Sequence, residues 1–286
     1  MPQALFRSFL LLGLFALVPA RAVVIDDAGT ETYNTSDPTD TDIAGWTTGW
    51  SGSGATGWNY VGQVNGASAV YLGDNWVLTA GHVGTGTFVL DGTNYTVVVG
   101  SGQSITNARG TADLTMFQIS TAPDLPSLTI SPTGPTVGTT VVMTGYGGGQ
   151  GETWGVDTVT RRNVTVQVTG YSFKTTDFET AYTGTNYAQL VSGDSGGGDF
   201  IYNAVTRQWE LAGINEAIDG SDNSYMVQLS TYASQIDGLE TTAVPEPRQG
   251  GLIVLLGLMG LATARKMKSR WSQWLWSARS SPPCQG

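Results

Sequence analysis

Short runs of β-branched and aromatic residues fill the chain from Trp58 onward, and glycine, asparagine and aspartate separate them. The turn residues recur at roughly 8–12-residue spacing, which is typical of short antiparallel strands joined by tight turns. The composition, with 39 glycines and only 13% charged residues, argues against a charged helical bundle. The pattern therefore predicts an all-β barrel or sandwich, with clear strand candidates at 69–72, 76–78, 95–99, 141–143, 164–168 and 211–214.

Charge is distributed unevenly along the chain. The segment from Asp26 to Glu246 holds all 23 acidic residues and only 5 of the 13 basic ones, so its net charge is −18, against −10 for the whole chain. Nucleic-acid binding depends on basic residues that neutralise phosphates. So acidic a segment argues against that function, and we expect its charge to serve solubility.

The first 22 residues have the pattern of a secretory signal peptide. Arg7 supplies the positive charge, residues 9–18 form an apolar run, and Pro19-Ala20-Arg21-Ala22 ends in a small-x-small cleavage site. Cleavage there leaves Val23 as the new N-terminus. The alternative is an uncleaved anchor helix, but the apolar run is too short for one.

The other end carries Pro245-Glu246-Pro247, a charge-free and mostly apolar stretch at 249–264 and a basic cluster at 265–270. This order resembles the PEP-CTERM sorting signal of Gram-negative bacteria. The resemblance implies export, transient anchoring in the inner membrane and cleavage by an exosortase. The final location would be the periplasm, the cell surface or the medium.

An ordinary single-span anchor is the alternative interpretation of this end. Residues 271–286 extend beyond the basic cluster, where sorting signals usually stop, and Trp271, Trp274 and Trp276 are suited to a membrane interface. The only cysteine, Cys284, lies in this tail. The exported domain therefore has no disulfide, and its stability must come from burial.

Three segments of the β region carry residues suited to acyl transfer. His82, the only histidine, follows an apolar strand; Asp113 leads into another strand; Ser195 lies within Ser192-Gly193-Asp194-Ser195-Gly196-Gly197-Gly198. Each has an ordinary structural explanation when taken alone. Together they supply a nucleophile, a base that is effective near neutral pH and an acid that orients the base.

Thr79-Ala80-Gly81-His82 and Gly193-Asp194-Ser195-Gly196-Gly197 resemble two motifs of the trypsin/chymotrypsin-like serine endopeptidases. The order histidine, aspartate, serine matches that family, and 225–232 resembles its last strand and C-terminal helix. The resemblance covers about residues 58–238. It implies two six-stranded antiparallel β-barrels with a short C-terminal helix, for which 231–239 is the candidate.

By this resemblance His82 is the general base, Asp113 its orienting acid and Ser195 the nucleophile. The amides of Gly193 and Ser195 form the oxyanion hole, and neither a cofactor nor a metal is required. The motif around the aspartate is short, so Asp91 and Asp124 are alternatives to Asp113.

The pocket and the activation signal depart from the family pattern. Gln189, six residues before the nucleophile, is neutral, whereas an acid at this position of the family would select arginine or lysine in the substrate. Ile218 stands where the family has a glycine, so it should narrow the pocket. Asn215 and Glu216 continue the same wall. Glu216 replaces a serine, so either it places a second carboxylate near Asp113 or the alignment is shifted by one residue.

The activating N-terminus is the second departure. No Ile-Val-Gly-Gly sequence precedes His82. Signal cleavage would instead expose Val23, and we expect its amine to pair with Asp194, so that export alone activates the enzyme.

The sequence thus predicts an exported serine endopeptidase that is not specific for arginine or lysine. A non-catalytic surface module and an esterase on the same scaffold are the alternatives.

A calcium loop at 36–42 is not predicted, because its spacing does not match an EF-hand. The predicted layout is a signal peptide at 1–22, a solvated polar arm at 23–57, the protease domain at 58–240, a linker with the Pro-Glu-Pro motif at 241–248, the apolar sorting helix at 249–264 and the basic tail at 265–286.

Overall fold

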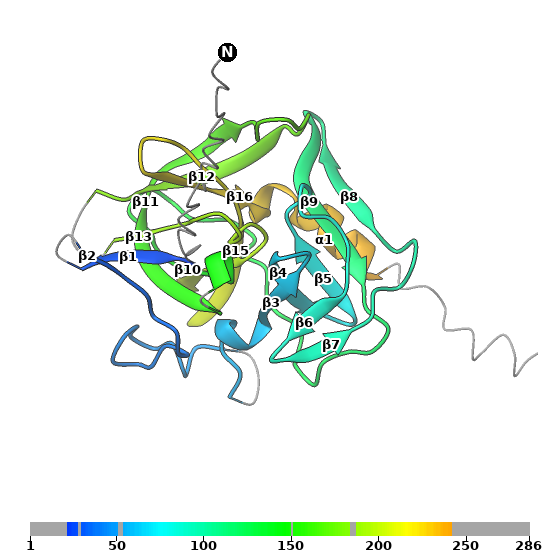
Figure 1. Ribbon diagram of the computed structural model, residues 1–286, viewed down its shortest axis with the longest axis horizontal. Helices are drawn as coiled ribbons and strands as arrows, with labels where there is room; N and C mark the ends of the chain where they lie inside the picture. The colour runs from blue at the N-terminus through cyan, green and yellow to red at the C-terminus, as the bar shows by residue number, and fades with distance from the viewer. Residues whose placement is uncertain (1–21, 28–29, 51–53, 150, 184–186, 242–286) are drawn as a thin grey trace, which may run out of the picture. The chain divides into compact units, whose positions relative to one another are not determined.

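A computed structural model describes residues 22–27, 30–50, 54–149, 151–183 and 187–241 (Figure 1). Nearly all of the predicted signal peptide, and the whole of the predicted Pro-Glu-Pro motif, apolar helix and basic tail, lie outside these ranges. Within them, no helix has the length and apolar character needed to cross a membrane.

A seven-stranded antiparallel sheet occupies the first half of the domain, in the order β7-β6-β3-β4-β5-β9-β8. Glycine and asparagine adopt positive φ at its turns, as at Asn65 and Gly66 between β3 and β4, and this lets the strands reverse within two residues. A short 3₁₀ helix, η1 (Gly57–Tyr60), leads into it. The strands are β3 (Val61–Val64), β4 (Ala67–Gly73), β5 (Trp76–Thr79), β6 (Phe88–Leu90), β7 (Thr93–Tyr95), β8 (Gln103–Asn107) and β9 (Gly110–Gln118).

A closed six-stranded barrel forms the second half, in the order β10-β11-β12-β16-β15-β14. Closure pairs every strand on both sides and leaves no free edge. The strands are β10 (Thr140–Gly145), β11 (Thr153–Val166), β12 (Thr175–Ala181), β14 (Gly198–Asn203), β15 (Gln208–Ile218) and β16 (Asn223–Gln228); the 3₁₀ helix η2 (Gly147–Gly149) lies between β10 and β11.

The chain then enters η3 (Leu229–Thr231) and α1 (Ala233–Thr241). The Gln235 side chain of α1 accepts a hydrogen bond from the Thr106 amide of β8 at 3.0 Å, so the last helix returns to the first sheet. The all-β prediction with one short C-terminal helix is confirmed. The first sheet differs in detail, because it has seven strands and its pairing leaves β7 and β8 as edges.

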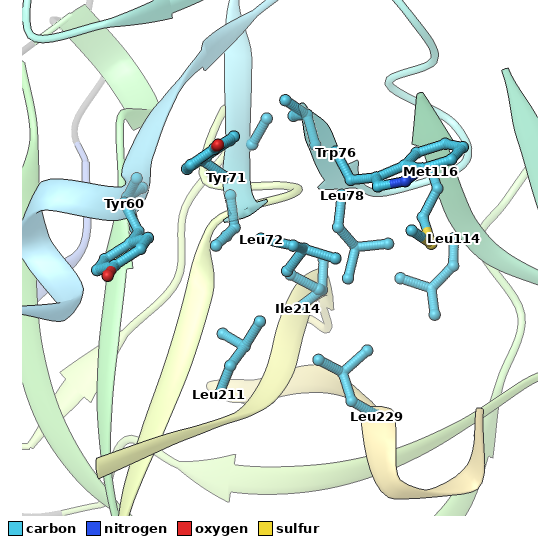
Figure 2. Packing of buried hydrophobic residues seen from close by; sticks show 14 of the residues in the cluster. Tyr60, Tyr71, Leu72, Trp76, Leu78, Leu114, Met116, Leu211, Ile214 and Leu229 are labelled. Carbon is cyan, nitrogen blue, oxygen red and sulfur yellow. The ribbon is translucent and has the colours of Figure 1, made fainter. Parts of the chain in front are cut away.

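One hydrophobic cluster joins the two halves. Figure 2 shows Leu72 and Leu78 of the first sheet close to Leu211 and Ile214 of the barrel, and all four side chains are fully buried or nearly so. Burial of this kind contributes about 1.5–3 kcal/mol per large apolar side chain. The interface between the halves is therefore fixed by packing.

The segment predicted as a solvated arm is packed onto the barrel instead. Its strand β1 (Val24–Asp27) pairs with β2 (Thr30–Thr32) and with β13 (Ala188–Gln189), forming a separate three-stranded sheet. Trp46 is fully buried and contacts Trp50, Phe200 and Trp209 edge-on. The prediction was wrong because it rested on the many polar residues of this segment. Its few tryptophans contribute more to the free energy of docking than the polar residues do.

Candidate active site

His82 and Asp113 form a tightly bonded pair. The Asp113 carboxyl is completely buried; its Oδ2 lies 2.6 Å from His82 Nδ1, and its Oδ1 accepts the His82 backbone amide at 2.7 Å. An ionised carboxylate can only accept, so Nδ1 carries the proton and Nε2 is left with a free lone pair. The His82 side chain remains 18% exposed, which leaves the ring accessible to a substrate.

Neighbouring strands hold this pair in place. His82 follows β5, and Asp113 lies within β9, which pairs with β5 along 76–79. The Thr175 hydroxyl accepts the Asp113 amide at 3.0 Å. The Tyr171 ring lies 5.7 Å from the His82 ring, centroid to centroid, with the two ring planes tilted by 51°.

The alternative acids are far from this role. Asp91 occupies the turn between β6 and β7, with φ of 46°, and Asp124 lies on the connection between the two sheets; both are exposed. Neither forms a hydrogen bond with His82 among the described residues. The structure thus brings together His82 and Asp113 and leaves Asp91 and Asp124 apart.

The Ser195 loop is shaped by glycine. Gly193 has φ of 99°, a conformation that side-chain-bearing residues rarely adopt. A Cβ at Gly196 would overlap the Ser68 carbonyl oxygen. Ser68 in turn fixes the loop, since its amide donates to the Ser195 carbonyl at 2.9 Å and its hydroxyl donates to the Gly193 carbonyl at 3.1 Å.

The amides of Gly193 and Ser195 are both free to bind another acceptor. Neither donates a hydrogen bond to any other described residue. The Ser195 side chain is partly exposed and lines a cavity. Within the part of the chain that the structure describes, no hydrogen bond joins the Ser195 hydroxyl to the His82 ring.

Asp194 is fully buried beneath the loop. Its carboxylate accepts the Gly147 amide at 2.8 Å and the Val191 amide at 2.9 Å, and the Val23 amide is a third donor. Burial outweighs these hydrogen bonds and raises the pKa of Asp194 to about 7. The Val23 backbone amide therefore contacts Asp194 while Val23 is an internal residue, and the ion pair between a free Val23 amine and Asp194 stays a prediction.

A cavity of about 790 Å³ opens beside Ser195. Asn215, Glu216 and Ile218 line it, and the volume is larger than a small side chain would need. Gln189 does not line it. Gln189 lies on β13, where it pairs with Val24. The strand pairing of the docked N-terminal segment, which the sequence did not predict, accounts for this position.

Two of these wall residues also have internal roles. Asn215 is fully buried, and its Nδ2 donates to the Thr144 carbonyl at 2.8 Å and to the Asp194 carbonyl at 3.1 Å. Glu216 is only 2% exposed and accepts the Thr175 hydroxyl at 2.7 Å. Ile218, in contrast, is 47% exposed at the cavity rim.

Sequence reasoning missed Ser68 and Thr175, which hold the Ser195 loop and Asp113. Both are common residues on ordinary strands, and no local pattern sets them apart. Sequence also gave no signal for Asp177, which hydrogen-bonds to Glu216. Among the described residues, no cluster of histidine, cysteine, aspartate and glutamate is suited to a metal ion.

The fold and this arrangement define a serine endopeptidase, a hydrolase of peptide bonds. The family model for trypsin matches residues 51–236, and the chain belongs to the trypsin family. No curated protein gives a significant sequence match.

Several solved protease structures are similar to the chain. The active form of the Rv3671c protease from M. tuberculosis has a TM-score of 0.46 at 16% identity, over 62% of this chain and 78% of that one. The NS6 protease from murine norovirus 1 has a TM-score of 0.44 at 16% identity, over 60% and 90%. The HtrA-type protease AlgW with a decapeptide has a TM-score of 0.45 at 20% identity, over 62% and 52%.

Proposed function

We propose that this protein is an exported serine endopeptidase that cleaves peptide bonds with His82, Asp113 and Ser195. The observation that carries the proposal is the double contact of buried Asp113 with His82, at 2.6 and 2.7 Å, in a trypsin-family chain. This contact supports His82 as a base that carries its proton on Nδ1 and leaves Nε2 free to accept another. A serine hydroxyl needs such a base to act as a nucleophile.

In the first step, His82 Nε2 takes the Ser195 proton while Oγ attacks the substrate carbonyl carbon. The carbonyl oxygen becomes negatively charged, and the free amides of Gly193 and Ser195 donate to it. Asp113 stabilises the imidazolium that forms. His82 then gives the proton to the leaving amine, and the peptide bond breaks to leave an acyl-enzyme.

In the second step, water replaces the amine. His82 removes a proton from the water, which attacks the acyl carbon, and the protonated ring returns that proton to Ser195 Oγ as the ester bond breaks. Chemistry of this kind requires no cofactor.

The cavity beside Ser195 is the proposed site for the substrate side chain before the scissile bond. We infer that it does not select arginine or lysine. Arg161 lines the cavity and would repel a substrate cation, and its partner Glu179 is already bonded to it at 2.9 Å. Asp219, also in the wall, accepts the Tyr225 hydroxyl at 2.8 Å.

We propose that removal of a signal peptide after Ala22 activates the enzyme. The Val23 amide already reaches Asp194, and Val23 and Ile25 belong to one buried apolar cluster with residues of the barrel strands. An α-ammonium group at Val23 would give the buried Asp194 carboxylate a counter-charge. The C-terminal PEP-CTERM-like segment would hold the protein at the inner membrane until an exosortase removes it.

Hydrolysis of a peptide library tests the proposed function. The full chain, exported and processed by a Gram-negative host, should cleave peptides, and Ser195→Ala should abolish cleavage. Cleavage products would also report the residue preferred at the scissile bond. Hydrolysis of simple esters without any peptide cleavage would instead identify an esterase, and an unchanged activity of Ser195→Ala would contradict the mechanism.

A further inference from the structure

Two buried carboxyl groups lie behind the His82–Asp113 pair. Asp177 belongs to β12 and is fully buried, and Glu216 belongs to β15 and is 2% exposed. The two side chains hydrogen-bond to each other. Since ionised carboxylates are acceptors only, such a bond requires a proton on one of them.

The other contacts of the pair leave one oxygen of each carboxyl group without a donor. Asp177 Oδ2 accepts the Val166 amide at 3.2 Å, and Glu216 Oε1 accepts the Thr175 hydroxyl at 2.7 Å. The remaining oxygens, Asp177 Oδ1 and Glu216 Oε2, are buried and receive no hydrogen bond from any N–H group or hydroxyl of the described residues. Each is therefore available to the other carboxyl.

Thr175 connects the pair to the catalytic acid. Its hydroxyl has a single proton, which goes to Glu216, so the same oxygen accepts the Asp113 amide at 3.0 Å. Without Glu216 as its acceptor, the Thr175 side chain would lose a contact that holds its oxygen against the buried Asp113 amide. Through Thr175, Glu216 is thereby linked to the backbone of Asp113, the hydrogen-bond partner of His82.

The charged and titratable groups around the pair are few. Asp113 faces it from β9, His82 from the segment after β5, and Tyr232 from the end of η3. Arg161 on β11 is bonded to Glu179, and Arg109 donates to the Thr176 hydroxyl at 3.3 Å. The pair thus has no bonded arginine or lysine among the described residues, and the cation that acts on it is the protonated ring of His82.

Burial and the neighbouring acid fix how many protons the pair holds. Burial, with the charge of Glu216, raises the pKa of Asp177 to about 11, and burial raises the pKa of Glu216 to about 7. Asp177 thus keeps its proton while Glu216 is the member that ionises, so the pair holds one proton and one negative charge once Glu216 is ionised.

We propose that Asp177 and Glu216 act as a single-proton positioning pair for the triad, orienting Thr175 and Asp113 and supplying a negative charge that favours the His82 imidazolium. The inference rests on the proposed function, because it needs His82 to be the base. Either carboxyl can carry the charge while its neighbour donates. The pair should therefore fail only when both members have lost their carboxyl groups.

The test compares Glu216→Gln, Asp177→Asn and the double variant in the full-length, processed protein. Each substitution keeps the shape of the side chain. In both single variants one carboxyl remains, with an amide N–H as its hydrogen-bond donor. In the double variant no charge can form, so the low-pH limb of the kcat/KM profile should move to lower pH by about 0.5–1 unit, and kcat/KM at pH 8 should fall about 3- to 10-fold.

The result that supports the proposal is a shift in the double variant larger than the sum of the two single shifts. Additive losses of activity with no movement of the low-pH limb would show that the residues only fill space, and would overturn it. The imidazole proton signal of His82, the only histidine, can be titrated by NMR in a Ser195→Ala background. That readout should show the same non-additive shift and does not depend on activity. If peptide cleavage is absent from the wild-type protein but the shift is present, the proposed function fails and the pair stands.

Discussion

The backbone amide of Val23 donates a hydrogen bond to the buried carboxylate of Asp194, the residue directly before Ser195, the proposed nucleophile. None of the ion pairs found among the described residues involves Asp194. Burial raises the pKa of Asp194 to about 7 and so disfavours the charge of this carboxyl in the uncleaved chain. Cleavage before Val23 would convert its amide into an ammonium group, which would neutralise the charge of the Asp194 carboxylate.

A protein whose chain begins at Val23 should therefore be at least roughly 100-fold more active than one that retains Ala22. Loss of one partner of a buried ion pair costs about 3–5 kcal/mol. In the chain that retains Ala22 the Val23 ammonium is missing, so fewer molecules would hold the formed Ser195 loop seen in the structure. N-terminal sequencing combined with peptide hydrolysis measures both quantities. Acetylation of the Val23 amine is the matched control, because it removes the charge without adding a residue. Full activity of the acetylated protein would refute activation by this amine.

Asp113→Asn should lower kcat by about 10⁴-fold near neutral pH while the protein stays folded. An asparagine amide facing Nδ1 would favour the wrong histidine tautomer, with the proton on Nε2. Steady-state kinetics at several pH values, with circular dichroism to verify the fold, measure this effect. Asp91→Asn and Asp124→Asn are controls of the same chemistry outside the pair, and a comparable loss in either would contradict the assignment of Asp113.

These residues show what a sequence can and cannot reveal. His82 and Ser195 stand in short motifs whose glycines are required by backbone geometry, so local patterns are sufficient to propose them as catalytic residues. Glu216 was recognised as unusual only because it replaces a serine. Its partner Asp177 could not be found, since the contact depends on how β12 and β15 pack around Thr175.

The fold, like the candidate site, could be predicted only where it depends on residues that are close together in the sequence. Alternating runs and turn residues predict strands, because both depend on neighbouring residues. The docking of β1 on β13 and the burial of Trp46 depend on contacts between distant segments, and the polar composition of 23–57 concealed them. This docking also removed Gln189 from the cavity.

Trp46→Ala should reduce the free energy of unfolding by about 3–5 kcal/mol, the usual cost of removing a fully buried large aromatic side chain. The reason is the loss of contacts with Trp50, Phe200 and Trp209. Denaturant unfolding followed by circular dichroism measures the change. Thr41→Ala, at an exposed position of the same segment, is the control. Equal stability of the two variants would mean that the arm is not docked.

Asp157→Asn should make stability less dependent on pH. Asp157 on β11 is 2% exposed, its Oδ2 has no hydrogen-bond partner, and burial raises its pKa from 3.8 to about 7. Between about pH 4 and pH 7, the folded state keeps a proton that the unfolded chain has released. The stability that this protonated group contributes below pH 4 is therefore lost as the pH rises through 7.

Between pH 5 and pH 8 the wild-type protein should lose roughly 2–3 kcal/mol through this group, whereas the asparagine variant should not. The difference between the two free energies of unfolding, measured at both pH values, isolates the effect. A variant whose stability follows the wild-type curve in parallel would show that Asp157 is not protonated in the folded state.

Labelling with a fluorophosphonate, followed by peptide mapping, tests the catalytic assignment most directly, because this reagent reacts with a serine only when a base activates it. Stoichiometric modification of Ser195 in the processed wild-type protein, and its loss in His82→Ala, is the predicted result. Absence of labelling in a correctly folded and processed protein, or equal labelling in His82→Ala, would contradict the account.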